Sequence, residues 1–180
     1  MQAYLMKIFW ALVVHVALAA FGLLLIYLIG GSESALSAVI REDYADRPEM
    51  IDSIRADAVS QLVTWLLWSL TVSWLAASLW LVSSQRFMPS GPQEGARKQG
   101  LWVVLLLVAL AVMAWLGWWL VYSRTVATEL SSSTVTVAML VTAISALLGY
   151  FLATGMNAKA TMRPSVPLGG LLPSFPGTRQ

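Results

Sequence analysis

The sequence of 180 residues contains no cysteine and few charged residues. Without cysteine the chain has no disulfide, no thiol nucleophile and no sulfur ligands for zinc or an iron–sulfur cluster. Charged types make up 11% of the residues, less than half of the roughly 25% that is usual in soluble domains. Because apolar types make up 58%, a soluble fold would lack polar surface. The composition excludes a disordered chain, a disulfide scaffold and a nucleic-acid-binding protein, and it predicts an integral membrane protein.

Long apolar runs are the main feature of the sequence. Four runs free of Asp, Glu, Lys, Arg and Pro cover residues 8–29, 60–82, 101–122 and 133–153. Each can cross about 30 Å of hydrocarbon as a helix that rises about 1.5 Å per residue. The runs are continuous and do not alternate, which favours helices over a β-barrel. We therefore expect an all-α integral membrane protein, with a four-helix transmembrane domain over residues 1–155 and a Pro-rich tail over residues 156–180.

Basic residues are unevenly divided between the two sides that four spans define. One side receives Glu94 and seven basic residues, which are Lys7, Arg86, Arg97, Lys98, Lys159, Arg163 and Arg179. The other side receives Arg41, Arg47, Arg55 and Arg124 with eight acids, which are Glu33, Glu42, Asp43, Asp46, Glu49, Asp52, Asp57 and Glu129. Because cytoplasmic loops are rich in Lys and Arg, both termini and loop 83–100 are predicted to be cytoplasmic. We expect a multi-pass protein of a bacterial inner (plasma) membrane.

The segment 32–59, between the first two spans, is predicted to form a short extracytoplasmic helical hairpin. Ser32 is expected to cap its first helix, whose apolar face is formed by Leu36, Val39 and Ile40. Asp46-Arg47-Pro48-Glu49 is typical of a helix start, since Asp46 can cap and Pro48 suits the first turn. The second helix should continue without a break into the second span. Its acidic face is either a docking surface for another subunit or a solvated cap.

The cytoplasmic tail combines proline with large apolar side chains. Prolines at 164, 167, 173 and 176 give two P-x-x-P motifs, which favour an extended polyproline conformation. A free tail would expose its apolar side chains, which are Leu168, Leu171, Leu172 and Phe175. We expect these four residues to bind a partner or to lie along the chain's own helices.

His15 is the titratable residue deepest within the spans, so it is the first functional candidate. Helical periodicity places it on one face with Ala11, Ala19 and Gly22, where another helix can approach closely. Counting along the spans places Ser73, Ser78, Ser145 and Tyr150 at a similar depth. The alternatives are a haem or chlorophyll ligand, a proton relay, and a neutral packing histidine. Because the spans contain neither a second histidine nor a carboxylate, we expect the packing role and no cofactor.

Other polar and small residues in the spans follow helical spacing. Ser60, Thr64, Thr71 and Ser78 fall within about 40° on the second span and are expected to face other helices, with a water-filled path as the alternative. Ser145, Gly149 and Ala153 form a close-packing face on the fourth span, beside Ala138, Thr142 and Ala146. The residues predicted to pack helices together are His15, Ala19, Gly22, Thr64, Thr71, Ser78, Ser145, Gly149 and Ala153.

Motifs for catalysis are missing from the sequence. It contains no Walker loop, dinucleotide glycine motif, H-E-x-x-H or G-x-S-x-G, so we expect no enzymatic activity and no metal site. Two hypotheses remain. The first is a non-catalytic subunit of a larger envelope complex, of secretion, conjugation, respiratory or motor type, whose partners are other membrane subunits and the lipid bilayer. The second is a small-solute channel or carrier that works as a homo-oligomer.

Overall fold

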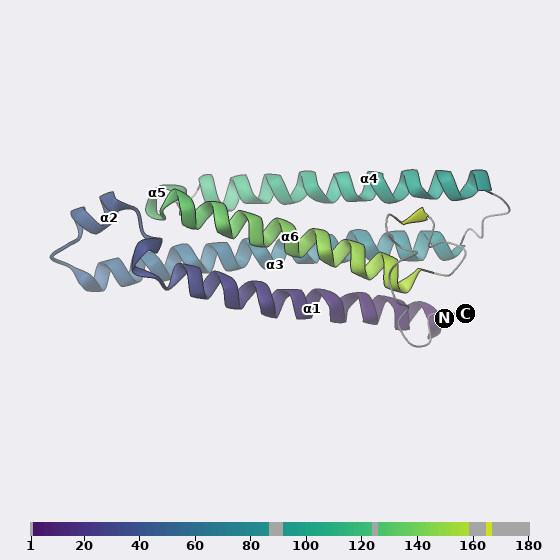
Figure 1. Ribbon diagram of the computed structural model, residues 1–180, viewed down its shortest axis with the longest axis horizontal. Coiled ribbons are helices and arrows are strands. Elements are labelled where there is room, and N and C mark those ends of the chain that lie inside the picture. The colour runs from purple at the N-terminus through teal and green to yellow at the C-terminus, as the bar shows by residue number, and fades with distance from the viewer. Residues whose placement is uncertain (1, 87–91, 124–125, 159–164, 167–180) are drawn as a thin grey trace.

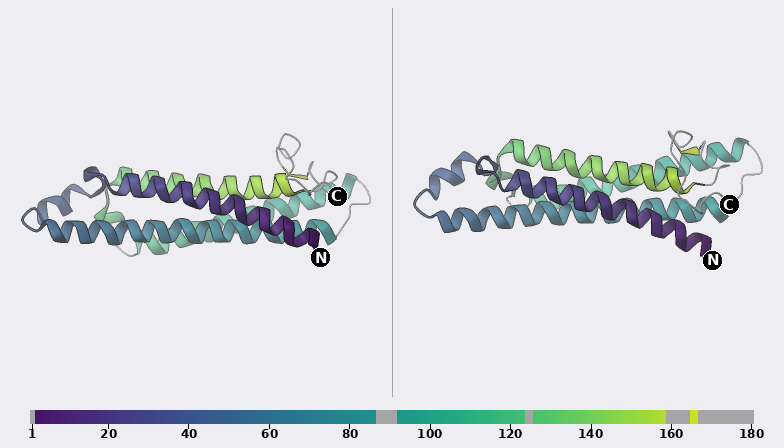
Figure 2. Two further views of the ribbon diagram at one scale, coloured as in Figure 1. Left: turned by 90° about the horizontal axis from the view of Figure 1, so that it is seen from below. Right: turned by 60° about the horizontal axis from the view of Figure 1, so that its bottom comes forward.

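The computed structural model describes residues 2–86, 92–123, 126–158 and 165–166. Four long helices, α1 (Gln2–Gly30), α3 (Pro48–Arg86), α4 (Pro92–Gly117) and α6 (Ser132–Asn157), form an elongated bundle (Figure 1). Two further views show the same lengthwise arrangement (Figure 2). The stretches long and apolar enough to cross a membrane are Leu5–Gly30, Pro48–Ser84, Lys98–Tyr122 and Ser132–Asn157. The predicted all-helical, multi-pass membrane protein with four membrane-length helices is therefore confirmed.

The bundle has two distinct ends. The short helices η1 (Glu33–Ala35), α2 (Ala38–Asp43) and α5 (Val126–Glu129) lie at one end, which we call the hairpin end (Figure 1). The start of α1 and the end of α6 lie at the opposite end, which we call the terminal end. Helices α1 and α4 thus run towards the hairpin end, whereas α3 and α6 run away from it and are parallel to each other.

Helix α3 begins at Pro48 and is the longest element. Proline fits the first helical position because its missing N–H would have no partner there, and the backbone N–H of Met50 donates to the Arg47 carbonyl at 3.0 Å. The helix continues without interruption for 39 residues, which corresponds to about 58 Å. The acidic segment and the second span are therefore one continuous helix.

The first helix of the hairpin begins later than the sequence suggested. Ser32 makes no capping hydrogen bond to η1, and the cap of α2 is Ser37, whose side chain accepts from the Ile40 N–H. The cause is a tertiary contact: Leu36 forms an isolated antiparallel bridge with Leu130, and it is fully buried. This bridge holds residues 36–37 extended, so the prediction that Ser32 caps this helix was wrong.

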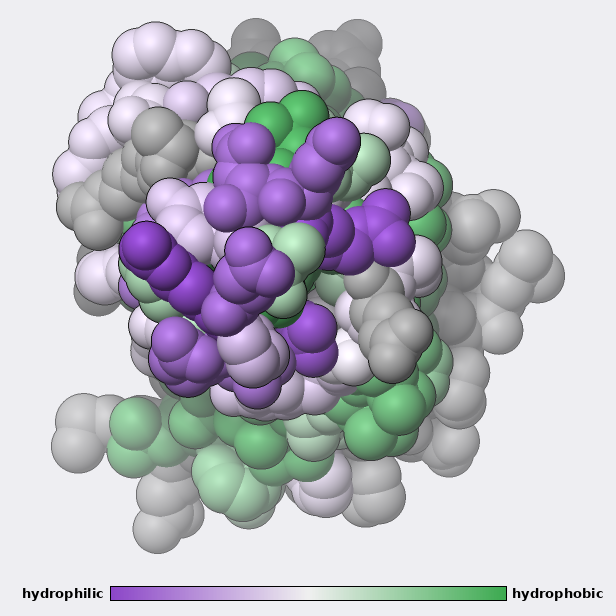
Figure 3. Space-filling view, turned by 90° about the vertical axis from the view of Figure 1, so that its left-hand side faces the viewer, coloured by the Kyte–Doolittle hydropathy of each residue, from purple (hydrophilic) through white to green (hydrophobic). Residues whose placement is uncertain are grey.

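Helix α3 is the centre of the bundle and packs against α1, α4 and α6. Helices α1 and α6 also pack against each other along much of their length. One buried cluster near the terminal end includes Trp80, Trp102 and Tyr150, and a second towards the hairpin end includes Ile26 and Leu66. Viewed from the hairpin end, hydrophilic residues cover the tip of the bundle and apolar residues appear behind them (Figure 3).

Candidate functional site

His15 lies in a polar junction between α1, α3 and α6. Its side chain is 4% exposed, and its Nδ1 donates to the Ala11 carbonyl at 2.8 Å. Its Nε2 lies 3.0 Å from the Ser73 hydroxyl, which also donates to the Ala146 carbonyl at 2.7 Å. Ser73 therefore connects the histidine of one helix to the backbone of another.

The hydrogen-bond partners of a neutral His15 show which ring nitrogen carries the hydrogen. A carbonyl only accepts, so the ring hydrogen is on Nδ1, facing Ala11. Nε2 is then an acceptor, and the single hydrogen of the Ser73 hydroxyl is divided between Nε2 and the Ala146 carbonyl. Within α6 this carbonyl can also accept from the backbone N–H four residues later. Nδ1 is thus paired within α1, while Nε2 shares the serine hydrogen with the Ala146 carbonyl of α6.

Gly149 provides the space that the imidazole occupies. A Cβ atom built at Gly149 would lie 2.7 Å from Nε2 of His15, closer than real contacts allow. A metal ion bound at Nε2 would have to replace Ser73 and enter the space against Gly149, while Nδ1 is occupied by Ala11. In the described part of the chain, no group of three or more His, Asp or Glu residues is placed to hold a metal ion. The chemistry that this junction supports is hydrogen bonding between helices.

A second pair of hydroxyls lies one helical turn from the junction. Because α3 and α6 are parallel, the Ser73–Ala146 contact places Ser69 level with Thr142, four residues earlier on each helix. Both residues are buried, at 0% and 1% exposure, and neither hydroxyl has a hydrogen-bond partner among the described residues. The interface between α3 and α6 therefore contains two polar levels. At Ser73 and Ala146 the groups are hydrogen-bonded, whereas at Ser69 and Thr142, the unpaired level, neither hydroxyl has a partner among the described residues.

The small-residue faces predicted on the first and fourth spans are turned into the bundle. Ser145, Gly149 and Ala153 of α6 are all buried, as are Ala138, Thr142 and Ala146 on the neighbouring strip. Gly22 of α1 is buried against Leu66, where an added Cβ would lie 2.8 Å from the leucine Cδ2, and Ala19 is half-buried. These residues lie where α1, α3 and α6 meet.

The polar stripe on α3 lies differently from the face that we expected. Ser60 and Thr71 are exposed, and Thr64 and Ser78 are half-buried. The hydroxyls of Thr64 and Thr71 donate to the carbonyls four residues back, Ser60 and Leu67, each at 2.8 Å. Such bonds satisfy a hydroxyl within its own helix. Thr71 is therefore exposed with its hydroxyl paired inside its own helix, and the buried polar face of α3 carries Ser69 and Ser73.

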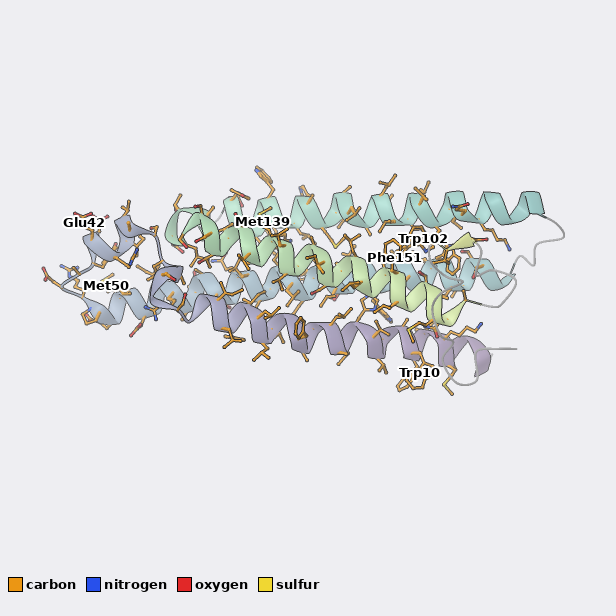
Figure 4. The ribbon with its side chains drawn as sticks, in the orientation of Figure 1. Trp10, Glu42, Met50, Trp102, Met139 and Phe151 are labelled. Atoms are coloured by element: carbon orange, nitrogen blue, oxygen red, sulfur yellow. The ribbon has the colours of Figure 1, made fainter. Side chains whose placement is uncertain are left out.

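Trp102 forms a second contact between helices, which the sequence did not predict. Its Nε1 donates to the Thr154 hydroxyl at 3.1 Å, and its carbonyl accepts from the Tyr150 hydroxyl at 2.9 Å. Its ring is 4.9 Å from the rings of both Tyr150 and Phe151. Figure 4 shows Trp102 and Phe151 together between α4 and α6 near the terminal end. This contact joins α4 to α6, whereas the His15 junction joins the other three helices.

The predicted partner-binding residues of the tail, Leu168, Leu171, Leu172 and Phe175, lie outside the described residues. Ser165 and Val166, within the first P-x-x-P motif, are described and buried. Val166, at 2% exposure, belongs to the same buried cluster as Trp80 and Trp102 at the terminal end. This part of the tail therefore packs on the ends of the chain's own helices.

Comparison with known proteins adds no relative. The chain matches no protein-family model, no curated protein and no solved structure.

Proposed function

We propose that the chain is a non-catalytic, multi-pass subunit of a larger membrane complex, in which it serves assembly and anchoring. The candidate complexes are envelope assemblies of secretion, conjugation, respiratory or motor type. The observation that carries the proposal is that the polar groups around His15 contact one another and connect three helices. Both nitrogens of this imidazole contact protein atoms of α1 and α3, and Ser73 connects the site to α6. An imidazole placed in this way supports the packing of three helices.

The surface chemistry of the bundle supports a role in contacts with other proteins. The hairpin end carries most of the acidic residues, and Glu42, Asp43, Asp46, Glu49 and Asp52 are exposed there. At the terminal end, the buried Val166 shows where the tail starts along the bundle. We propose that the apolar tail residues that follow bind a cytoplasmic subunit or the ends of the spans. The acidic hairpin end and this tail would then be two separate contact regions.

The proposed orientation places the hairpin end outside a bacterial inner membrane and both termini in the cytoplasm. It is supported by the seven basic residues on the terminal side against four on the other. Because the chain has no cysteine of its own, a single introduced cysteine is the only thiol that a labelling reagent can reach. Tyr44→Cys and Ala127→Cys should react with an impermeant thiol reagent added outside, and Pro92→Cys should not. Reversed labelling would contradict the orientation.

Purification from native membranes followed by mass spectrometry tests the main proposal. We expect the full-length chain to co-purify with the same heteromeric membrane proteins in at least two mild detergents. Truncation after Val166, which keeps this buried residue and removes the apolar tail residues that follow it, should leave insertion and abundance unchanged and should weaken this association. A chain that purifies alone as a homo-oligomer, with full-length and truncated forms behaving alike, would contradict the proposal.

A small-solute channel or carrier built as a homo-oligomer is the second candidate. It is favoured by the exposure of Ser60 and Thr71 on α3, because an oligomer could enclose this polar stripe. Disulfide formation between copies carrying Thr71→Cys, with solute flux in proteoliposomes that Thr71→Leu abolishes, would support it. Carriers usually hold a charge or a broken helix at the middle of the membrane, and α3 is charge-free and unbroken there, which favours the subunit.

A further inference from the structure

A groove of about 390 Å³ lies between α4 and α6, with α3 as its floor. The residues that line it come from three helices: Trp65 of α3, Leu110, Met113 and Ala114 of α4, and Thr136, Met139, Leu140, Thr142 and Ala143 of α6. These residues belong to the membrane-length segments, and residues 136–143 lie in the half of α6 that starts at the hairpin end. Ala114, Met139 and Ala143 are exposed, so the groove opens to the bilayer.

Side-chain contacts close both ends of this groove. Towards the terminal end, Trp102 contacts Tyr150 and Phe151 and joins α4 to α6. Towards the hairpin end, the hydroxyl of Tyr122 lies 3.7 Å from Sδ of Met139. In Figure 4, Trp102 and Met139 mark these two positions along the bundle. Helices α4 and α6 are thus held apart at a fixed separation.

The floor of the groove is preformed. Nε1 of Trp65 donates to the Met113 carbonyl at 3.2 Å. The indole lies against Gly117, where an added Cβ would be 2.7 Å from Cζ2 of the tryptophan. The hydrogen bond to Met113 and the close contact with Gly117 hold the indole in place. The space above the ring is therefore present without a bound ligand.

The size of the groove selects its occupant. Residues 136–143 advance about 10 Å along α6, so a volume of about 390 Å³ corresponds to a cross-section of about 40 Å². A helix of about 10 Å diameter has a cross-section of about 80 Å², so the groove admits side chains of a neighbouring helix but does not enclose the helix itself. An extended hydrocarbon chain fits, and the flexible thioethers of Met113 and Met139 can adapt to it.

We propose that this groove holds one acyl chain of a membrane phospholipid, which fills the space between α4 and α6. Seven of the nine lining residues are apolar, and lipid chains are the apolar groups that an open groove at this depth meets. The bound chain supplies packing for α4 where this helix is separated from α6. The inference does not depend on the proposed function.

Photolabelling of the full-length protein tests the site directly. The protein is placed in vesicles of phosphatidylethanolamine and phosphatidylglycerol that contain a trace of phospholipid with a diazirine at the middle of one acyl chain. After irradiation, we expect adducts on Met113, Met139 and Leu140 at least fivefold above those on Phe21 and Leu24, which are exposed apolar residues of α1. Equal labelling of the groove and of α1 would overturn the proposal.

Two matched variants give an independent test. Ala143→Phe fills the groove, whereas Ala111→Phe adds the same ring to an exposed position of α4 that does not line it. By native mass spectrometry in mild detergent, wild type and Ala111→Phe should retain one phospholipid per chain, and Ala143→Phe should retain at least fivefold less. Retention of lipid by Ala143→Phe at the wild-type level contradicts the site. A photo-crosslink from Leu140 to a second protein chain, in place of lipid, also contradicts the lipid site. If Ala143→Phe fails to fold, the photolabelling of the wild-type protein decides whether the groove binds lipid.

Discussion

Helices α1, α3 and α6 are joined differently from α4. The three helices approach closely at Gly22 and Gly149, and they share the polar junction of His15, Ser73 and Ala146. Helix α4 packs along α3 and meets α6 through Trp102 at one end. At the other end the π-helical segment that follows α4, η2 (Trp118–Tyr122), meets α6 where Tyr122 contacts Met139. Small residues therefore produce a continuous interface, whereas large aromatic residues act as spacers and leave a groove between them.

The largest effect is expected when the aromatic contact of α4 is removed. Trp102→Ala deletes a buried ring, its hydrogen bond from Nε1 to the Thr154 hydroxyl and its contacts with the rings of Tyr150 and Phe151, so the free energy of unfolding should fall by about 3–5 kcal/mol. Denaturation in mixed micelles, followed by circular dichroism, measures it. Trp115→Ala is the matched control because this ring is 59% exposed, and we expect less than about 1 kcal/mol for it. Equal losses would show that Trp102 does not hold α4.

A smaller loss is expected from filling the close contact at His15. Gly149→Leu places a side chain where Nε2 of His15 lies, and such overpacking should lower the free energy of unfolding by about 1–3 kcal/mol. Gly100→Leu adds the same group where nothing lies within 4 Å, and removing a helical glycine there should stabilise by up to about 1 kcal/mol. Thermal melting in detergent compares the two. A Gly149→Leu variant as stable as wild type would show that the helices do not meet closely here.

Loss of the Ser73 hydroxyl should cost about 1 kcal/mol, the usual range for a hydrogen bond between membrane helices. Ser73→Ala removes contacts to both His15 and Ala146, whereas Ser60→Ala alters an exposed hydroxyl of the same helix. A double-mutant cycle with His15→Ala isolates the pair, and the two changes should be less than additive. Strict additivity would mean that the histidine and the serine do not interact.

The smallest effect, of opposite sign, is expected at the unpaired level. Thr142→Val keeps the shape of the side chain and removes a buried hydroxyl that has no partner among the described residues. The free energy of unfolding should be unchanged or should rise by up to about 1 kcal/mol. Thr154→Val is the control, since this hydroxyl accepts from Trp102 and donates to Tyr150, and its loss should destabilise. A destabilising Thr142→Val would reveal a hydrogen bond to this hydroxyl.

The sequence predicts helices and their small-residue faces better than it predicts contacts between them. The four spans follow from uninterrupted apolar runs, and the small faces of α1 and α6 follow from spacing of three and four residues. Depth counting also placed Ser73 level with His15, and the structure brings them to 3.0 Å. Each of these predictions uses only the spacing of residues within one helix, or the depth of a residue in the membrane, and both can be counted along the sequence.

Contacts that depend on how the helices are rotated against one another were not predicted. The stripe of Thr64 and Thr71 has clear periodicity, but periodicity defines a face without saying what that face contacts, and internal hydrogen bonds leave it independent of any neighbour. The pairing of Trp102 with Tyr150 joins residues 48 positions apart, which no local spacing encodes. The cap at Ser37 likewise depends on the bridge from Leu36 to Leu130.

The length of α3 has a mechanical consequence. Its 39 residues form one uninterrupted rod, of which the part from Pro48 to Ser60 extends about 18 Å beyond the predicted span. A force applied to the acidic tip acts on this arm, and the stiff helix carries it through the bundle to the packing of Trp80 and Trp102 at the far end. Because Ala58 and Val59 of this arm are buried in the cluster towards the hairpin end, a tilt of the tip also displaces the helices packed against them.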